Sequence, residues 1–513
     1  MAVKNLAMVY SAELEGVNAK LIEVEIDLNV GIHSFGIFGL VDKALHEAKE
    51  RVNSALKNSG VKPPNRENRK ITINLAPADV KKTGSQYDLA IALGYLLATK
   101  QIAEFDTRDK IFLGELALDG RLRPVNGALS VAQLASEKNI RYLFLPIENA
   151  DEAAAITSVT VVPLESLSDA VAMLEGRKAL VATATASSAP QSANAPDFSE
   201  IKGQENAKRA LTIAAAGSHN IFFIGPPGVG KSFLARAFAG ILPGVTTEEA
   251  IEITKVWSAA GLHPKGLIRE RPFRAPHQTA TTAALVGGGS DAKPGEISLA
   301  HRGVLFLDEV AEFQRSTLDA LRQPIESGFI RVSRAKGSIT FPAKFIFVTA
   351  MNPCPCGYHG DSEKECKCSA YDVIKYQKRI SGPLLDRIDL QVKVGRVKLE
   401  ELRKGELEAE ANASVRKVVE RARQVQQARF GGEAPKTNSE MSSRETRDMV
   451  RLTPHAESFL ETLEKSNLSP RSYYRLLKVA RTIADLDEKD SVTPEHLAEA
   501  FSYRLRDDDN NPR

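Results

Sequence analysis

The chain has 513 residues, of which 43% are hydrophobic and 26% are charged, so it can bury sizeable cores and is too long for a single one. The formal net charge of +3 excludes a globally basic nucleic-acid-binding protein, because any such surface must be local. No apolar run approaches the ~18 residues that a membrane span needs, and the first residues lack the apolar core of a signal peptide. We therefore expect a cytoplasmic protein of about three domains.

Residues 1–177 are expected to form an α/β domain. Apolar and acidic side chains alternate in residues 21–28, which is typical of a half-buried strand. Apolar residues then recur at helical spacing over residues 41–55, and residues 71–75 alternate again as a further strand.

Two segments of this domain, residues 82–94 and 113–127, resemble the motif regions of the Lon protease domain, a Ser/Lys peptidase with a ribosomal-S5-like α/β fold. Aligned on that pattern, the nucleophile position is Gln86 and the catalytic lysine position falls near Val131. Neither side chain can do the chemistry. Ser85 is a neighbouring hydroxyl without a paired lysine and is most simply a turn residue. The resemblance implies a Lon-like domain that is inactive as a peptidase.

Residues 178–196 contain alanine, serine, threonine and proline with almost no large apolar side chain. Such a segment cannot bury enough surface to offset its ordering entropy. We expect a flexible linker between two domains.

A glycine-rich loop follows the linker. It lies between an apolar strand, residues 221–224, and a predicted helix, residues 233–239, which is the order that a phosphate-binding loop requires. Lys231 would place a positive charge near the β- and γ-phosphates, and the Ser232 hydroxyl would hold Mg²⁺. The loop consists of Gly225, Pro226, Pro227, Gly228, Val229, Gly230, Lys231 and Ser232.

Two carboxylates complete the predicted phosphate site. Residues 303–307 are continuously apolar, as in a strand buried on both faces, and they end at Asp308 and Glu309. Asp308 is expected to hold Mg²⁺ through its water shell, and Glu309 to orient and deprotonate the attacking water. ATP and Mg²⁺ are therefore the expected substrate and cofactor.

These motifs resemble those of ring-forming AAA+ ATPases, and the resemblance assigns roles to further residues of a core at 197–397. Asn352, at the end of a third apolar strand, would help to position the water. Arg387 would be an arginine finger that contacts the ATP of a neighbouring subunit, although a structural ion pair is the alternative. Ile201 would lie over the adenine, or residues 197–204 would simply cap a helix.

Insertions in this core resemble those of the magnesium-chelatase and MCM-like AAA+ branch, where they point toward the central pore. Residues 261–296 are rich in glycine and proline, and residues 330–341 alternate around a Lys-Gly turn, which predicts a hairpin with a basic tip. Arg331, Arg334 and Lys336 are candidates for contacts with the DNA backbone. The alternative is a solvated hairpin edge protected by charge.

The four cysteines fall in one short window, as two Cys-x-Cys pairs. Four thiolates can bind one tetrahedral zinc ion, so we expect a structural zinc site, with His359 as a possible substitute ligand. Reduced buried thiols and a redox-sensitive pair are the alternatives. The expected ligands are Cys354, Cys356, Cys366 and Cys368.

Residues 398–508 are expected to form a helical lid. Ser469 caps a helix in whose first turn Arg471 lies, the place where AAA+ lids present a second sensor to the γ-phosphate. Three basic residues further along this helix are expected to be surface charges, and residues 507–513 to be disordered. The three basic residues are Arg475, Lys478 and Arg481.

The combination of an inactive Lon-like domain, a magnesium-chelatase-like AAA+ core, the cysteine window and a helical lid resembles the ComM/YifB family. That resemblance implies a hexameric, ATP-driven DNA helicase that promotes branch migration when transforming DNA is integrated. Its expected partners are single-stranded and branched DNA, further copies of the chain and the recombination machinery. Two alternatives remain, a metal-chelatase-type motor and a protein unfoldase, both acting on protein partners.

Overall fold

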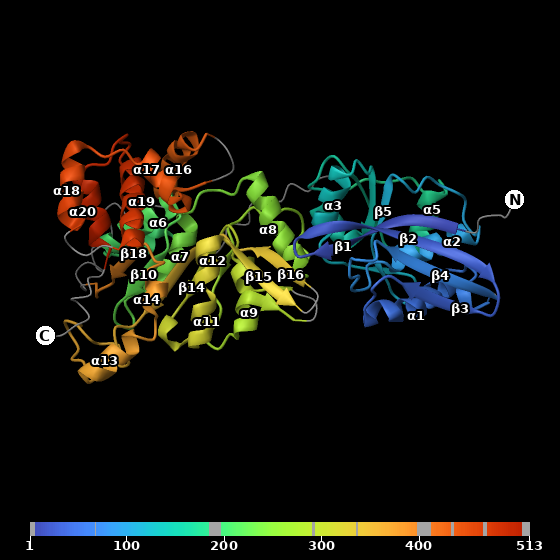
Figure 1. Ribbon diagram of the computed structural model, residues 1–513, viewed down its shortest axis with the longest axis horizontal. Helices are drawn as coiled ribbons and strands as arrows, with labels where there is room; N and C mark the ends of the chain where they lie inside the picture. The colour runs from blue at the N-terminus through green and yellow to red at the C-terminus, as the bar shows by residue number, and fades with distance from the viewer. Residues whose placement is uncertain are drawn as a thin grey trace.

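The computed structural model shows an elongated molecule with a first α/β domain at one end, a second α/β core in the middle and a helical lid at the other end (Figure 1). Most of the predicted linker and the predicted disordered end of the chain lie outside the described residues. The described residues are 6–66, 68–183, 196–289, 293–334, 337–397, 412–431, 436–464 and 469–504.

The first domain is built on a seven-stranded sheet of order β3-β4-β2-β1-β5-β8-β9. The pairs β1/β2 and β2/β4 are antiparallel, and the other pairs are parallel. The strands are β1 (Leu6–Glu15), β2 (Asn18–Val30), β3 (Ser34–Phe38), β4 (Arg69–Ala76), β5 (Lys110–Phe112), β8 (Tyr142–Pro146) and β9 (Thr160–Leu164), with a small ribbon of β6 (Glu115–Leu116) and β7 (Leu122–Arg123). The helices are α1 (Lys43–Asn58), α2 (Asp88–Ala98), α3 (Ala128–Glu137), α4 (Ile147–Ala153) and α5 (Leu167–Leu174).

The alternation of residues 21–28 corresponds to the observed burial, since Ile22, Val24 and Ile26 are fully buried while the acidic residues between them are partly exposed. Helix α2 is buried on nearly all sides, because its sequence is apolar all round. The expected α/β class of this domain is confirmed.

The central core is a five-stranded, wholly parallel sheet of order β11-β14-β17-β10-β18. Continuous apolar strands let both faces of this sheet be covered, and one hydrophobic cluster lies on each face. The strands are β10 (Ile221–Ile224), β11 (Phe273–Arg274), β14 (Val304–Leu307), β17 (Ile346–Met351) and β18 (Leu390–Lys393). The helices are α6 (Glu205–Gly217), α7 (Lys231–Ile241), α8 (Thr247–Ala259), α9 (Thr282–Val286), α10 (Glu296–Leu299), α11 (Arg315–Ala320), α12 (Arg322–Ser327), α13 (Ala370–Gln377) and α14 (Gly382–Leu385).

Two small ribbons interrupt the core. The segments β12 (Gly287–Gly288) and β13 (Lys293–Pro294) pair in one, and β15 (Phe329–Arg334) and β16 (Gly337–Pro342) form an antiparallel hairpin in the other. The hairpin expected from residues 330–341 is therefore present. Arg331 is exposed on it, whereas the side chain of Arg334 and the whole of Lys336 lie outside the described residues.

The described part of the lid contains five helices and shares one hydrophobic cluster with the core, through the packing of α16 (Asn412–Arg429) and α19 (Pro470–Leu486) on α6. Ser469 caps α19 and Pro470 follows at its first position, as expected. The expectation of surface charges on this helix is wrong for Arg481, which is 1% exposed. The helices are α16 (Asn412–Arg429), α17 (Ser443–Met449), α18 (Pro454–Glu464), α19 (Pro470–Leu486) and α20 (Pro494–Ser502).

The first domain contacts the core through α3 and α8 (Figure 1). The backbone N–H of Gly127 donates to Ser258 Oγ at 3.0 Å, and Leu129 packs with Ala250 and Leu267 in a small apolar cluster. No helix in the described part of the chain is long and apolar enough to cross a membrane.

Candidate nucleotide-binding site

The phosphate loop joins the end of β10 to the start of α7. Gly228 and Gly230 have φ values of +78° and +88°, a left-handed conformation that glycine adopts without strain. Gly225 is needed for a different reason, since a Cβ there would lie 2.1 Å from the carbonyl oxygen of Val394. The loop therefore turns back against the end of the neighbouring strand β18 and directs backbone N–H groups toward the N-terminus of α7.

Lys231 joins the loop to the neighbouring strand. Its Nζ donates to the carbonyl oxygens of Gly225 and Pro226 at 2.7 and 2.8 Å, and to Asn352 Oδ1 at 3.0 Å. Burial lowers the pKa of Lys231 to about 8, against the opposing effect of the nearby carboxylates Asp308 and Glu309. The amine, Asn352 and the two carboxylates are thus gathered at the carboxyl edge of the sheet.

A hydroxyl and a carboxylate meet at this edge. Ser232 Oγ donates to Asp308 Oδ2 at 2.5 Å, and the backbone N–H of Glu309 donates to Asp308 Oδ1 at 2.9 Å. Hard cations such as Mg²⁺ prefer oxygen ligands of this kind, so Ser232 and Asp308 fit the predicted cation. Glu309 is exposed and has a left-handed φ of +47°, a costly conformation for a residue with a side chain and one that is common at active sites.

Arg387 lies at the opposite edge of the sheet. Its carbonyl oxygen accepts from Asn220 Nδ2 at 3.0 Å, and Asn220 directly precedes β10, whereas the phosphate loop directly follows that strand. The four residues of β10 span about 13 Å at ~3.3 Å per residue. The structure therefore places Arg387 away from the phosphate loop of its own chain.

Arg471 lies beside Arg387, because both guanidinium groups form ion pairs with the carboxylate of Glu326. The sequence predicted that Arg471 contacts a γ-phosphate, but it did not indicate at which edge of the sheet Arg471 lies. In the structure Arg471 lies next to Arg387. The sequence analysis did not predict a role for Glu326. The one feature that could have indicated it is its position three residues before the predicted hairpin strand β15.

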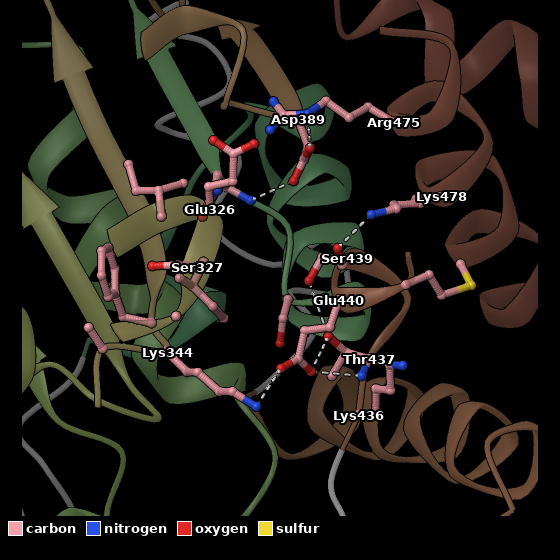
Figure 2. Close-up of a pocket in the computed structure, with 18 of the residues that line it drawn as sticks. Glu326, Ser327, Lys344, Asp389, Lys436, Thr437, Ser439, Glu440, Arg475 and Lys478 are labelled. Carbon is pink, nitrogen blue, oxygen red and sulfur yellow. Dashed lines mark hydrogen bonds and ion pairs between the residues drawn. The ribbon is translucent and has the colours of Figure 1, made fainter. Parts of the chain in front are cut away.

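A cavity of about 1260 Å³ opens beside these arginines, between the core and the lid. Figure 2 shows Glu326 and Lys344 on its core side and Arg475 and Lys478 on its lid side. Burial opposes the ionisation of Asp389 in this cavity, yet Arg475 and His219 hold its pKa at about 2. The amino edge of the sheet is therefore lined by fixed charges of both signs.

The four cysteines form one cluster directly after Asn352. The Sγ atoms of Cys354, Cys356 and Cys366 lie 3.4 to 3.7 Å apart, and all four Sγ atoms lie within 4.8 Å of one another. A tetrahedral zinc ion with Zn–S bonds of ~2.3 Å requires S–S spacings of about 3.8 Å, so the cluster has the dimensions of a zinc site. His359 is exposed and contacts Cys354 Sγ through its backbone N–H, at 3.3 Å.

The cysteine loop packs on the phosphate loop. Gly357, with a φ of +86°, lies so close to Pro227 that a Cβ would be 2.7 Å from the proline Cδ. The segment from Asn352 to Cys368 therefore carries both a nucleotide-site residue and the metal-site candidates.

The Lon-like positions of the first domain make structural contacts. Gln86 Nε2 donates to Glu13 Oε2 at 3.1 Å, and Val131 is 2% exposed within α3. Ser85 Oγ donates to Glu115, and Lys82 donates to the carbonyl of Pro77. The absence of peptidase activity from this domain stays a prediction.

Ile201 is buried at 5% exposure in the cluster shared by core and lid. A capping box between Asp197 and Glu200 precedes it. The capping alternative is thus present, and adenine binding by Ile201 stays a prediction.

Comparison with known proteins covers nearly the whole chain. Three family models match, for the magnesium chelatase subunit ChlI over residues 197–402, for subunit ChlI of Mg-chelatase over residues 24–149 and for the ChlI C-terminal region over residues 409–504. The competence protein ComM of Haemophilus influenzae is 43% identical over 98% of this chain and 97% of its own length. YifB of Escherichia coli is 43% identical over 98% of both chains. The magnesium-chelatase 38 kDa subunit of Cereibacter sphaeroides is 30% identical over 30% of this chain and 52% of its own.

Proposed function

This chain belongs to the magnesium-chelatase-like AAA+ family that includes ComM and YifB, and from that premise we propose that it is a ring-forming, ATP-driven DNA motor. Its proposed action is that of a helicase which promotes branch migration during recombination in natural transformation. The name of the Haemophilus influenzae relative, a competence protein, supports the biological setting.

The observation that carries the ATPase proposal is the convergence of Lys231, Ser232, Asp308 and Asn352 at one edge of the sheet. Phosphoryl transfer needs positioning and charge neutralisation more than covalent help. Lys231 would contact the β- and γ-phosphates, Ser232 and Asp308 would hold Mg²⁺, and Glu309 with Asn352 would orient the attacking water. Bound Mg²⁺ neutralises charge on the phosphates.

The positive charge for the γ-phosphate is proposed to come from another subunit. The backbone of Arg387 lies at the amino edge, one length of β10 or about 13 Å from its own phosphate loop, and Arg471 shares its partner Glu326. A ring, expected to be a hexamer, would bring this edge against the nucleotide of the adjacent copy. The nucleotide site would then be shared between two subunits.

DNA contact is proposed at the β15–β16 hairpin. Arg331 is exposed on β15, and Arg334 and Lys336 belong to the same strand and turn by sequence. Contacts of lysine and arginine with phosphates are independent of sequence and sensitive to salt. Binding should therefore weaken steeply as the salt concentration rises.

The test is the ATPase rate with and without single-stranded or branched DNA, for the parent chain and for the variant Arg334→Ala/Lys336→Ala. We expect DNA to raise the parent rate and the double variant to lose most of this increase. Lys231→Ala is the inactive control. If DNA leaves the parent rate unchanged while casein raises it, the chain is an unfoldase rather than a DNA motor.

The cysteine cluster is proposed to hold one structural zinc ion. Metal analysis of the purified protein should give about one zinc per chain, and Cys366→Ser/Cys368→Ser should lose it. The physical reason is that two thiolates cannot close a tetrahedral site. A stably folded, metal-free parent protein would contradict this proposal.

A further inference from the structure

Glu326 is the shared partner of both arginines that are proposed to act on a neighbouring nucleotide. One carboxylate oxygen accepts from Arg387 Nη2 and the other from Arg471 Nη2. The two arginines come from different parts of the fold, since Arg387 precedes β18 of the core and Arg471 lies in the first turn of the lid helix α19. One side chain thus fixes the spacing between a core arginine and a lid arginine.

The same residue lies at the base of the β15–β16 hairpin. Glu326 is in α12, which ends one residue later, and Gly328 reverses the chain into β15 with a left-handed φ of +71°. The carbonyl oxygen of Gly328 accepts from the N–H of Ala343 at 2.8 Å, which closes the base of the hairpin. The base of the hairpin is therefore joined to α12 by a single residue, Gly328.

A second contact ties α12 to the segment that carries Arg387. Arg322 Nη2 donates to Ser381 Oγ at 2.9 Å, and Ser381 is the residue directly before α14. Arg387 itself is held by the carbonyl oxygen of Pro383, which its Nη1 contacts at 2.6 Å. Helix α12, α14 and the guanidinium of Arg387 are thus linked by hydrogen bonds.

The ion pair of Glu326 with Arg471 is weak enough for this arginine to exchange the carboxylate for a phosphate. Glu326 is 54% exposed, and although partial burial opposes its ionisation, Arg387 and Arg471 lower its pKa. The Arg471 side chain is 38% exposed, and exposed ion pairs contribute only about 0–1 kcal/mol, so a phosphate of an adjacent subunit could compete for this guanidinium. The Arg387 side chain is less accessible, at 13% exposure. The Nε of Arg387 is buried without a hydrogen-bond partner among the described residues.

We propose that Glu326 is a positioning residue through which the hairpin sets Arg387 and Arg471 for the nucleotide of the neighbouring subunit. Displacement of the hairpin by DNA moves α12, and the carboxylate carries the two guanidinium groups with it. The inference rests on the proposed function, and it adds the route by which DNA binding changes the rate of hydrolysis.

The first test uses Glu326→Gln, which keeps the size of the side chain and removes its charge. We expect the stimulation of kcat by DNA to fall about tenfold, the effect of about 1.4 kcal/mol on the barrier. The KM for ATP and the affinity for a single-stranded oligonucleotide should change less than about twofold, because Lys231 and the hairpin tip are untouched. Glu445→Gln is the matched control, since Glu445 lines the same cavity but pairs with Lys436.

The second test asks whether Glu326 acts through the arginines. In an Arg471→Ala background, which keeps Arg387 for the neighbouring nucleotide, Glu326→Gln should lower the DNA-stimulated rate by a smaller factor than it does in the parent. An additive effect in that background, or full DNA stimulation in Glu326→Gln alone, would overturn the inference. Circular dichroism and the thermal midpoint verify that each variant is folded.

The two proposals fail in different ways. A parent protein whose ATPase does not respond to DNA contradicts the proposed function. If DNA stimulates the parent and Glu326→Gln equally, the proposed function stands and the positioning role of Glu326 is wrong.

Discussion

Gly357 connects two sites that lie far apart in the sequence. It belongs to the cysteine loop, and its α-carbon lies against Pro227 of the phosphate loop. The sequence marked each site by its own motif, but neither motif indicates that the two loops are in contact. This contact makes the geometry of the nucleotide site dependent on the cysteine loop.

Gly357→Ala should therefore weaken ATP binding. A Cβ would lie 2.7 Å from Pro227 Cδ, so the phosphate loop must shift. We expect the KM for ATP to rise about tenfold, corresponding to about 1.4 kcal/mol of lost binding. ATPase kinetics at several ATP concentrations measure this.

Gly360→Ala is the matched control for that experiment. Gly360 lies in the same loop with a similar φ of +75°, but nothing lies within 4 Å of its added Cβ. Both variants therefore carry the backbone strain, and only Gly357→Ala carries the clash. An equal rise in KM for both variants would show that strain in the cysteine loop, and not contact with Pro227, is responsible.

Helix α19 is the helix whose buried and exposed faces the sequence pattern predicted least well. Its basic residues recur every three or four positions, a spacing that predicts one solvent-facing side. Instead α19 is packed against α6, α16 and α20, and Arg481 is buried between lid segments. Its guanidinium contacts Asp485 through Nε at 3.1 Å and the carbonyl of Asp490 at 2.6 Å, and Arg429 also pairs with Asp485.

Arg481→Met should strongly destabilise the lid. Asp485 keeps Arg429 as a partner, but the carbonyl oxygen of Asp490 loses its buried donor, and loss of a hydrogen bond to a charged group costs about 1.5–3 kcal/mol. The thermal midpoint of the lid transition should fall by several degrees in calorimetry. Arg421→Met is the control, since Arg421 pairs with Glu488 at the surface, where such pairs contribute about 0–1 kcal/mol. Equal midpoints for the two variants would contradict the role given to the buried network.

For the whole molecule, we expect the contact between the first domain and the core to depend on pH. Glu152 of α4 is buried beside Asn149 and near Ser258 of α8, and burial raises its pKa to about 7. The folded state then holds a proton that the unfolded state releases above about pH 4.5. Stability should fall as the pH rises from about 4.5 to about 7, since the unfolded state binds fewer protons in that window.

Glu152→Gln should remove this part of the pH dependence. The free energy of unfolding of Glu152→Gln should exceed that of the parent by an amount that grows through this pH window. The difference should reach up to about 3 kcal/mol above pH 7, because the pKa of Glu152 is ~2.5 higher in the folded state than in the unfolded state. Thermal unfolding at pH 5 and pH 8 measures the difference. Glu148→Gln, on the exposed side of the same helix, is the control. A constant difference between Glu152→Gln and the parent at the two pH values would show that Glu152 does not ionise in this range.

The first domain also reaches the hairpin proposed to bind DNA. A Cβ on Gly16, in the turn between β1 and β2, would lie 3.0 Å from Ile339 Cγ2 and 3.1 Å from the carbonyl oxygen of Thr340. The hairpin therefore has the first domain on one side and α12 with Glu326 at its base. No local pattern in the sequence indicates this placement.

The sequence by itself determined the α/β class of the first domain, the buried strands of the phosphate site and the motif residues Lys231, Ser232 and Asp308 that follow them. These features follow from local apolar periodicity and from the rule that parallel strands end at one edge. The tertiary structure alone decided that Arg387 and Arg471 share Glu326, that Gly357 lies on Pro227, and that Arg481 is buried. Each of these depends on contacts between residues distant in the chain, which a local pattern cannot encode.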